Sequence, residues 1–348
     1  MLLEQYDWGL DARTLQILFA LGLGVLLGAA AQITRFCLRR AVAPDAADRG
    51  QAGAVWVTAL AVAITGFVIA SAAGYVDLQG HRYLDGAVPV VAIVLGGLAF
   101  GVGMILTRGC ASRLTVLAAT GNLRAAVVLV VFAVVAHSTL KGVLAPVRTT
   151  LGGLTAELPF GTLYAIPYAP YLAAAVALLA AAALVLRFRP SASQVALGAS
   201  IGLIPVLGWA TTSVLLMDEF DPLEVQSAAF TLPWSDTLFW AIASSAIPAG
   251  FGTGLIGGVL LGSFLSATVR GELKLESFED APQMLRYFAG ASLMGFGGVL
   301  AGGCTIGAGL SGSAALSVAA LLALASITIG AAAFSRLGTR QPVAAVAG

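Results

Sequence analysis

A run of uncharged residues, too long for one membrane helix, constrains this chain more than any other feature. It extends over 49 residues, from Tyr287 to Ser335, and carries Cys304 with glycines on both sides. A single helix of this length would span roughly 74 Å, more than twice the roughly 30 Å of a hydrocarbon core. The chain is therefore expected to turn back near the cysteine. Irregular backbone at that depth is tolerated only where protein shields it or where it lines a wet cavity.

The composition is that of a polytopic membrane protein. Hydrophobic residues make up 59% of the 348 residues and charged residues only 10%, against roughly 25% charged residues in soluble domains. The net charge of +1 offers no basic patch for nucleic acid, and the three cysteines form no CxxC pair, which argues against a disulfide framework. The acidic start, with Glu4, Asp7 and Asp11, is unlike a secretory signal, so the first apolar segment is expected to remain as a membrane helix.

Charge-free windows mark the expected membrane spans. They cover residues 14–34, 50–76, 86–107, 125–140, 158–186, 190–217, 237–269 and 287–335. With the last window counted as two passes, the sequence predicts an all-α polytopic membrane protein of about nine transmembrane helices, with re-entrant or broken helices, in a single transmembrane domain over residues 1–348. The window 237–269 contains Pro248 among glycines, so it forms either one kinked helix or two short ones.

Lysine and arginine predict the orientation of these spans. Alternate connecting segments hold 14 of the 18 basic residues: Arg35, Arg39, Arg40, Arg49, Arg108, Arg113, Arg124, Arg187, Arg189, Arg270, Lys274, Arg286, Arg336 and Arg340. The opposite segments hold Arg13, Arg82, Lys141 and Arg148, and one of them, 217–236, has five acids and no base. The positive-inside rule therefore predicts an N-terminus outside the cell and a C-terminus in the cytoplasm.

The sequence also repeats itself. Placing Cys110 on Cys304, an offset of 194 residues, superposes Gly96, Gly101, Gly103 and Gly109 on Gly290, Gly295, Gly297 and Gly303. A looser template, small-x3-Gly-x8-Cys, fits before Cys37 as well, and a fourth copy at Gly258 and Gly262 has Gly271 where the cysteine would be. The predicted repeat halves are about 14–145 and 237–335, with connecting helices at about 158–217. Because the helices before Cys110 and Cys304 are expected to run in opposite directions, the pattern favours inverted repeats.

Each repeat delivers a thiol at the end of a glycine-rich helix. A helix that begins after a mid-membrane break presents unpaired N–H groups and a positive dipole end, which attract an anion. A neutral thiol adds a weak, polarisable donor suited to an anion with a soft atom such as sulfur. The candidate site residues are Cys304, Cys110, Cys37, Gly303, Thr305, Gly109, Ser112, Arg113, Arg108 and Arg39. The alternative is that the glycines serve close helix packing, the cysteines fill apolar gaps, and the arginines are ordinary positive-inside residues.

Other chemistry is sparse. His137 and Lys141 lie four residues apart, so they share a helix face as a candidate proton or anion site, unless Lys141 only reaches toward the membrane surface. Asn122 is expected to cap the helix that begins at Leu123. The two histidines and three separated cysteines make a poor metal-ligand set, so no metal or other cofactor is expected.

Three stretches resemble the YeeE/YedE sulfur-transport family, which includes thiosulfate uptake proteins. They are ITRFCLRRAV around Cys37, GMILTRGCASRLTVLAATGNLR around Cys110 and GGVLAGGCTIGAGLSGSAALS around Cys304. The resemblance implies an hourglass-shaped protein of the bacterial inner membrane, whose three cysteines line a constricted path and pass thiosulfate along by S–H hydrogen bonds. It also implies a cytosolic sulfur carrier related to the TusA proteins as a partner. The chain departs from the common pattern at Ala308, where many members have histidine.

Three classes of function remain open at this point. The leading hypothesis is a transporter, not an enzyme, that imports a small sulfur-containing anion such as thiosulfate, or another sulfur or selenium species, past Cys304, then Cys110, then Cys37. The second is a membrane thiol redox or sulfur-relay enzyme, which the missing CxxC disfavours. The third is a structural or assembly subunit in which the glycines only pack helices.

Overall fold

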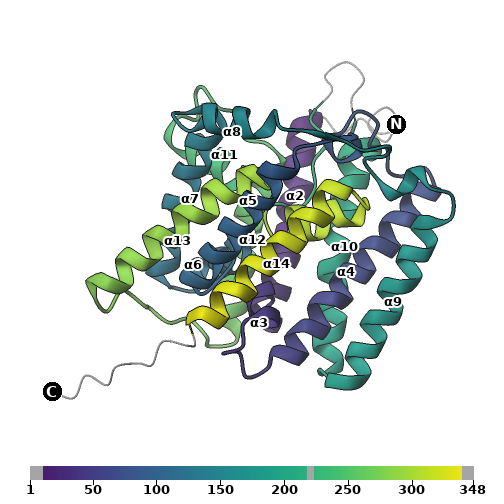
Figure 1. Cartoon of the computed structure of the whole chain (residues 1–348). Helices are drawn as coiled ribbons and strands as arrows, with labels where there is room; N and C mark the ends of the chain where they lie inside the picture. The colour runs from purple at the N-terminus through teal and green to yellow at the C-terminus, as the bar shows by residue number, and fades with distance from the viewer. Residues whose placement is uncertain (1–10, 218–222, 339–348) are drawn as a thin grey trace.

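The structure, a computed structural model, describes residues 11–217 and 223–338 and is almost entirely helical (Figure 1). Its elements are α2 (Ala12–Thr34), α3 (Leu38–Val42), α4 (Arg49–Ala72), η1 (Arg82–Leu84), β1 (Ala87–Val88), α5 (Val90–Leu106), α6 (Ala111–Ala119), α7 (Leu123–Lys141), α8 (Ala145–Gly152), β2 (Ala156–Glu157), η2 (Leu163–Ala165), α9 (Ala169–Phe188), α10 (Ala192–Ala210), η3 (Thr211–Leu215), α11 (Thr231–Ile242), α12 (Phe251–Val269), α13 (Ala281–Leu300), η4 (Gly307–Gly312) and α14 (Val318–Gly338). The described ranges leave out several residues on which the predictions rest: Glu4 and Asp7 of the acidic start, Arg340 of the basic set, and residues 218–222 of the acidic connection.

The predicted multi-pass, all-α membrane fold is confirmed. Within the described ranges, eight helical segments are long and apolar enough to cross a membrane, and they contain α2, α4, α5, α7, α9, α10, α12 and α14. The further pass in the sequence-based count corresponds to α13, which has 20 residues but begins with the polar stretch APQMLR. Helix α9 lies at one edge of the molecule, beside α4 (Figure 1), and leaves Leu172, Leu179 and Leu186 exposed, as a helix that faces lipid would.

Two breaks fall in the long apolar windows. Window 237–269 contains two helices, because α11 ends at Ile242 and α12 begins only at Phe251. In window 287–335, α13 ends at Leu300 and α14 begins at Val318, with Cys304 and the π-helical turn η4 between them. The expected turn beside the cysteine is therefore confirmed.

Contacts at glycines show how the helices α5, α13 and α14 run relative to one another. A Cβ atom on Gly103 of α5 would meet Gly290 and Met294 of α13, whereas one on Gly96 would meet Gly297, so α5 and α13 run antiparallel. Close approach of backbones at small residues is the usual basis of helix packing in membranes. Opposite directions are what the inverted-repeat hypothesis requires of these two helices, and the repeat itself stays a prediction.

Helix α14 lies on the other side of α5 and runs parallel to it. A Cβ on Gly97 would meet Ser326, and one on Gly101 would meet Ile327 and Ala331. Helices α13 and α14 therefore run in opposite directions on either side of the break at Cys304.

The molecule has two ends that matter for the site. One end, here called the α8 end, carries α8, η1 and the antiparallel pair β1–β2, in which Ala87 faces Glu157. The opposite end carries α3 and is called the α3 end (Figure 1). Helix α2 begins at the α8 end and α14 finishes at the α3 end.

Candidate functional site

All three cysteines follow the same local backbone motif. Two residues before each cysteine, the chain adopts the left-handed conformation that ends a helix, at Arg35 (φ 53°), Arg108 (φ 58°) and Gly302 (φ 73°). Cys37 is then the N-cap residue of α3, Cys110 is the N-cap residue of α6, and Cys304 precedes η4. The sequence-based expectation of a thiol at a new helix start is thus met at Cys37 and Cys110.

The fourth copy of the template ends differently. Gly271, which the template aligned with the cysteines, itself has the left-handed conformation (φ 63°). Its structural counterparts are therefore Arg35, Arg108 and Gly302, and the position two residues further on is Leu273. The left-handed residue comes nine positions after the template glycine Gly262 but seven positions after Gly28, so this copy is shifted by two residues and offers no thiol.

Two of the thiols are in direct contact. The sulfur atoms of Cys37 and Cys110 lie 3.7 Å apart, and both side chains are buried. The Cys110 sulfur also lies 3.3 Å from the Ser112 hydroxyl oxygen. The Thr305 side chain, from the residue after Cys304, lies close to the same Cys110 thiol. Sulfur and hydroxyl groups therefore follow one another from Thr305 to Cys37.

Cys304 is fully buried beneath a turn of backbone amides. The Gly307 N–H donates a hydrogen bond to its sulfur over 3.3 Å, and the backbone of Ile306 and Phe230 lies nearby. Gly303, just before it, has no room for a side chain, because a Cβ there would lie 2.7 Å from the Ala308 nitrogen. The same backbone N–H groups could donate hydrogen bonds to an anion bound beside the sulfur, as N–H groups at helix N-termini do.

The candidate arginines separate into one near the thiols and two away from them. The Arg113 guanidinium is half-buried, donates to the Gln32 side-chain oxygen over 3.5 Å and interacts electrostatically with Cys37. Arg108 is exposed at its turn, whereas Arg39 forms an ion pair with Asp45 (2.5 Å). Gly109 accepts a hydrogen bond from the Thr107 hydroxyl through its carbonyl oxygen and holds the turn before Cys110.

Cavities approach Cys304 from the α8 end. The larger has a volume of about 470 Å³ and is lined by residues 79–83, Trp209, residues 224–229, Leu232, Pro233, Gly307 and Ser311. A smaller one, of about 80 Å³, shares Arg82, Tyr83 and Gly307 with it and reaches Gly303. Because Gly307 also hydrogen-bonds the Cys304 sulfur, these cavities lead from the α8 end to the backbone around that thiol.

Side chains that no sequence motif marks line this approach. The Tyr83 hydroxyl donates to the Gly307 carbonyl oxygen (3.3 Å), and the Trp209 indole N–H donates to the Ser311 carbonyl oxygen (3.0 Å), so both aromatic residues are fixed to η4. His81 stacks edge-on against Trp209 and accepts the Tyr83 N–H through Nδ1. Burial, and secondly the charge of Arg82, lower the pKa of His81 to about 4, so this ring is neutral at pH 7.

His137 and Lys141, the other candidate pair, lie apart from the thiols. The His137 ring nitrogen Nδ1 is 3.0 Å from the Ser235 hydroxyl, and the ring stacks on Phe239 of α11. Lys141 is the last residue of α7. The structure thus gives His137 a packing partner and a hydrogen-bond partner on α11.

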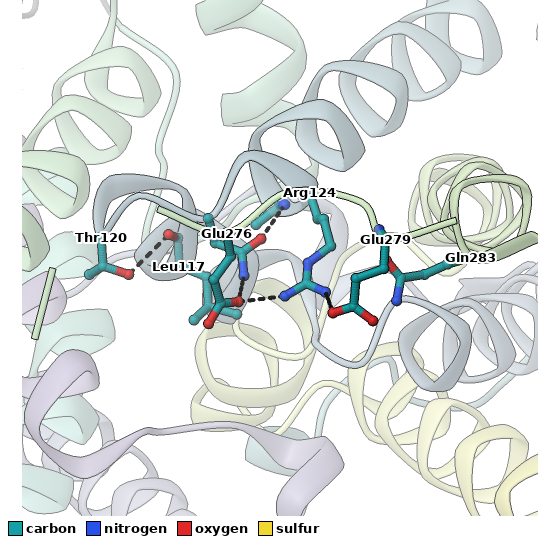
Figure 2. Close-up of polar contacts among 8 residues, drawn as sticks. Leu117, Thr120, Arg124, Glu276, Glu279 and Gln283 are labelled. Atoms are coloured by element: carbon teal, nitrogen blue, oxygen red, sulfur yellow. Dashed lines mark hydrogen bonds and ion pairs between the residues drawn. The ribbon is translucent and has the colours of Figure 1, made fainter. Parts of the chain in front are cut away.

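At the α3 end, the connection between α12 and α13 is bound to the turn between α6 and α7. Figure 2 shows the Arg124 guanidinium between Glu276 (2.5 Å) and Glu279 (3.4 Å). The Asn122 amide donates to Glu276 as well, and its oxygen caps α7, as predicted. The Leu123 N–H donates to the Glu276 carbonyl oxygen over 2.8 Å. These contacts hold the α12–α13 connection against the start of α7.

The part of the chain that the structure describes contains no candidate metal site. No group of three or more His, Cys, Asp or Glu side chains lies close enough together there to hold a metal ion. The described site consists of three buried thiols, neighbouring hydroxyls, backbone amides and a few arginines.

Comparison with known proteins places the chain in a family. Residues 33–333, which include all three cysteines, match the family model described as sulphur transport. The thiosulfate transporter TsuA of Escherichia coli K12 is 27% identical over 254 residues, covering 66% of this chain and 69% of the relative. The thiosulfate transporter TsuA of Spirochaeta thermophila is 25% identical over 313 residues, covering 77% and 82%. This multi-pass membrane protein therefore belongs to the sulphur transport family.

Proposed function

We propose that this protein imports thiosulfate across the bacterial inner membrane, past Cys304, then Cys110, then Cys37. The observation that carries the proposal is the continuity of polar sulfur and hydroxyl groups: the Thr305 side chain lies close to the Cys110 thiol, whose sulfur is 3.7 Å from that of Cys37. The two curated relatives, both named thiosulfate transporters, support thiosulfate as the substrate.

The chemistry of thiosulfate suits such a path. The ion carries two negative charges, a soft terminal sulfur and three oxygens, so it accepts hydrogen bonds from thiols, hydroxyls and amides. Neutral thiols donate weakly and keep the path free of fixed negative charge, which would repel the ion. Gly303, Thr305, Gly109 and Ser112 shape the path beside the thiols, and Arg113 attracts the anion at its inner part.

The direction of transport follows from the basic residues. Most of the arginines lie in the connections that include the left-handed turns at Arg35 and Arg108 and the ion pair between Arg124 and Glu276. The α8 end has few arginines. By the positive-inside rule the α3 end faces the cytoplasm and the α8 end faces outward. Arg39 and Arg108 then lie at the exit, where a cytosolic carrier related to the TusA proteins would receive the sulfur species.

A membrane thiol enzyme is the second candidate, and one observation favours it. The Cys37 and Cys110 sulfurs lie 3.7 Å apart, so a two-electron acceptor could oxidise the pair to a disulfide with release of two protons. Such an enzyme would form a covalent intermediate with the sulfur it transfers.

Uptake of radiolabelled thiosulfate into proteoliposomes distinguishes the two functions. We expect saturable uptake above that of protein-free liposomes, with the protein's intact mass unchanged when turnover is quenched with acid and alkylating agent. Accumulation of a thiosulfate adduct or a persulfide on a cysteine, without label inside the vesicles, would favour the enzyme and overturn the transporter.

A further inference from the structure

Arg82 lies where several cavities of the α8 end meet. It lines the cavities of about 470 and 80 Å³ that lead to Gly307, and also a third of about 230 Å³. Its guanidinium donates to the carbonyl oxygen of Gly302, two residues before Cys304, over 3.0 Å. The residue thus belongs both to the surface that an entering solute meets and to the backbone turn that holds the first thiol.

The charge of Arg82 is available for a ligand. In the part of the chain that the structure describes, no carboxylate forms an ion pair with it, although Asp85 and Glu224 line cavities that it also lines. The side chain is exposed, and its guanidinium carbon lies 5.2 Å from the centre of the Tyr83 ring. One of its five N–H donors is engaged at Gly302, so others remain to bind a solute.

The loop that carries Arg82 is held in place. Tyr83, its neighbour, is buried and bonded to Gly307, while His81 accepts the Tyr83 N–H and packs against Trp209. A side chain on a fixed loop loses less conformational freedom on binding than one on a mobile loop. The backbone that carries Arg82 is therefore anchored to η4, and its guanidinium is bonded to the turn that precedes Cys304.

We propose that Arg82 is the residue that selects the oxygen end of the anion at the entrance, so that thiosulfate enters with its terminal sulfur toward Cys304. A guanidinium presents a planar fork of donors that matches the oxygens of an oxyanion. The thiol and the Gly307 N–H, deeper in, offer weak donors that suit the soft sulfur atom. The entrance thereby recognises the two ends of one ion with two kinds of group. This inference rests on the proposed function, since it assigns a role within the same path.

The test measures equilibrium binding of radiolabelled thiosulfate and sulfate to purified protein, beside uptake in proteoliposomes. We expect Arg82→Gln to weaken binding of both ions about tenfold and to raise the KM of thiosulfate uptake by a similar factor, with Arg82→Lys in between. Cys304→Ala should weaken thiosulfate binding but leave sulfate binding as in the wild type, because sulfate has no soft sulfur to place. The matched control is Arg13→Gln, which removes the same charge near the start of α2, away from these cavities, and should change neither.

Two outcomes would overturn the inference. Unchanged binding and KM in Arg82→Gln would remove Arg82 from recognition, and equal losses in Arg82→Gln and Arg13→Gln would reduce its role to net charge. Failure of the proposed function looks different: the wild type would then show no uptake, while Arg82-dependent binding could still be measured.

Discussion

Replacing Cys304 by alanine is expected to lower the initial rate of thiosulfate uptake at least about tenfold, toward the background of empty liposomes. The thiol is fully buried beside the cavity wall at Gly307, so its removal leaves only the backbone amides as donors at this point of the path. A hydrogen bond to a charged group contributes about 1.5–3 kcal/mol, which corresponds to about 10- to 150-fold in rate if it is made in the rate-limiting state.

Serine at position 304 provides the matched variant. Its hydroxyl can donate a hydrogen bond but is harder and less polarisable than a thiol, so we expect uptake between that of the alanine variant and the wild type. Both variants should keep the thermal unfolding midpoint of the wild type within a few degrees, since only one buried atom changes. Wild-type uptake in Cys304→Ala would exclude this thiol from the path.

Replacing Gly258 by valine is expected to have the largest effect on folding. The parallel helices α2 and α12 pack through glycines, and a Cβ atom at Gly258 would lie 2.2 Å from the Leu21 carbonyl oxygen and 2.9 Å from the Gly24 Cα. Backbone atoms cannot move aside as a flexible side chain can, so the two helices must separate. Overpacking typically costs about 1–3 kcal/mol, and more where backbone is displaced.

The neighbouring glycine is the control for this substitution. A Cβ atom at Gly257 meets nothing within 4 Å, so Gly257→Val loads the same helix with the same residue without a clash. We expect the unfolding midpoint in detergent, followed by tryptophan fluorescence, to fall by several degrees in Gly258→Val and little in Gly257→Val. Equal midpoints would contradict the close α2–α12 packing.

The break at Cys304 could be predicted because length alone decides it. No helix of 49 residues fits a bilayer, and glycines at 302 and 303 permit the turn. The repeated template placed Cys37 and Cys110 at the ends of glycine-rich helices, whereas the short helices α3 and α6 that begin after them are seen only in the structure. Whether 237–269 was one helix or two was not, because Pro248 and its glycines are compatible with a kink or a break, and packing against neighbouring helices decides between them.

The neighbourhood of the thiols could not be read from the sequence. Cys37 and Cys110 are separated by 73 positions and Thr305 by almost 200 more, so their contact depends on how distant helices pack. Arg82 lies in a short connection with no periodic pattern, and its partner Gly302 is 220 residues away. In the sequence it is one of four basic residues in the segments predicted to face outward, and no motif marks it. Only the cavities around it indicate a role.

The initial rate of radiolabelled thiosulfate uptake in the three single variants Cys37→Ala, Cys110→Ala and Cys304→Ala tests the central claim most directly. The proposed path predicts that every one of them loses most of its uptake while keeping the unfolding midpoint of the wild type, because the three thiols act in series. Undiminished uptake in all three variants would contradict a path through the cysteines.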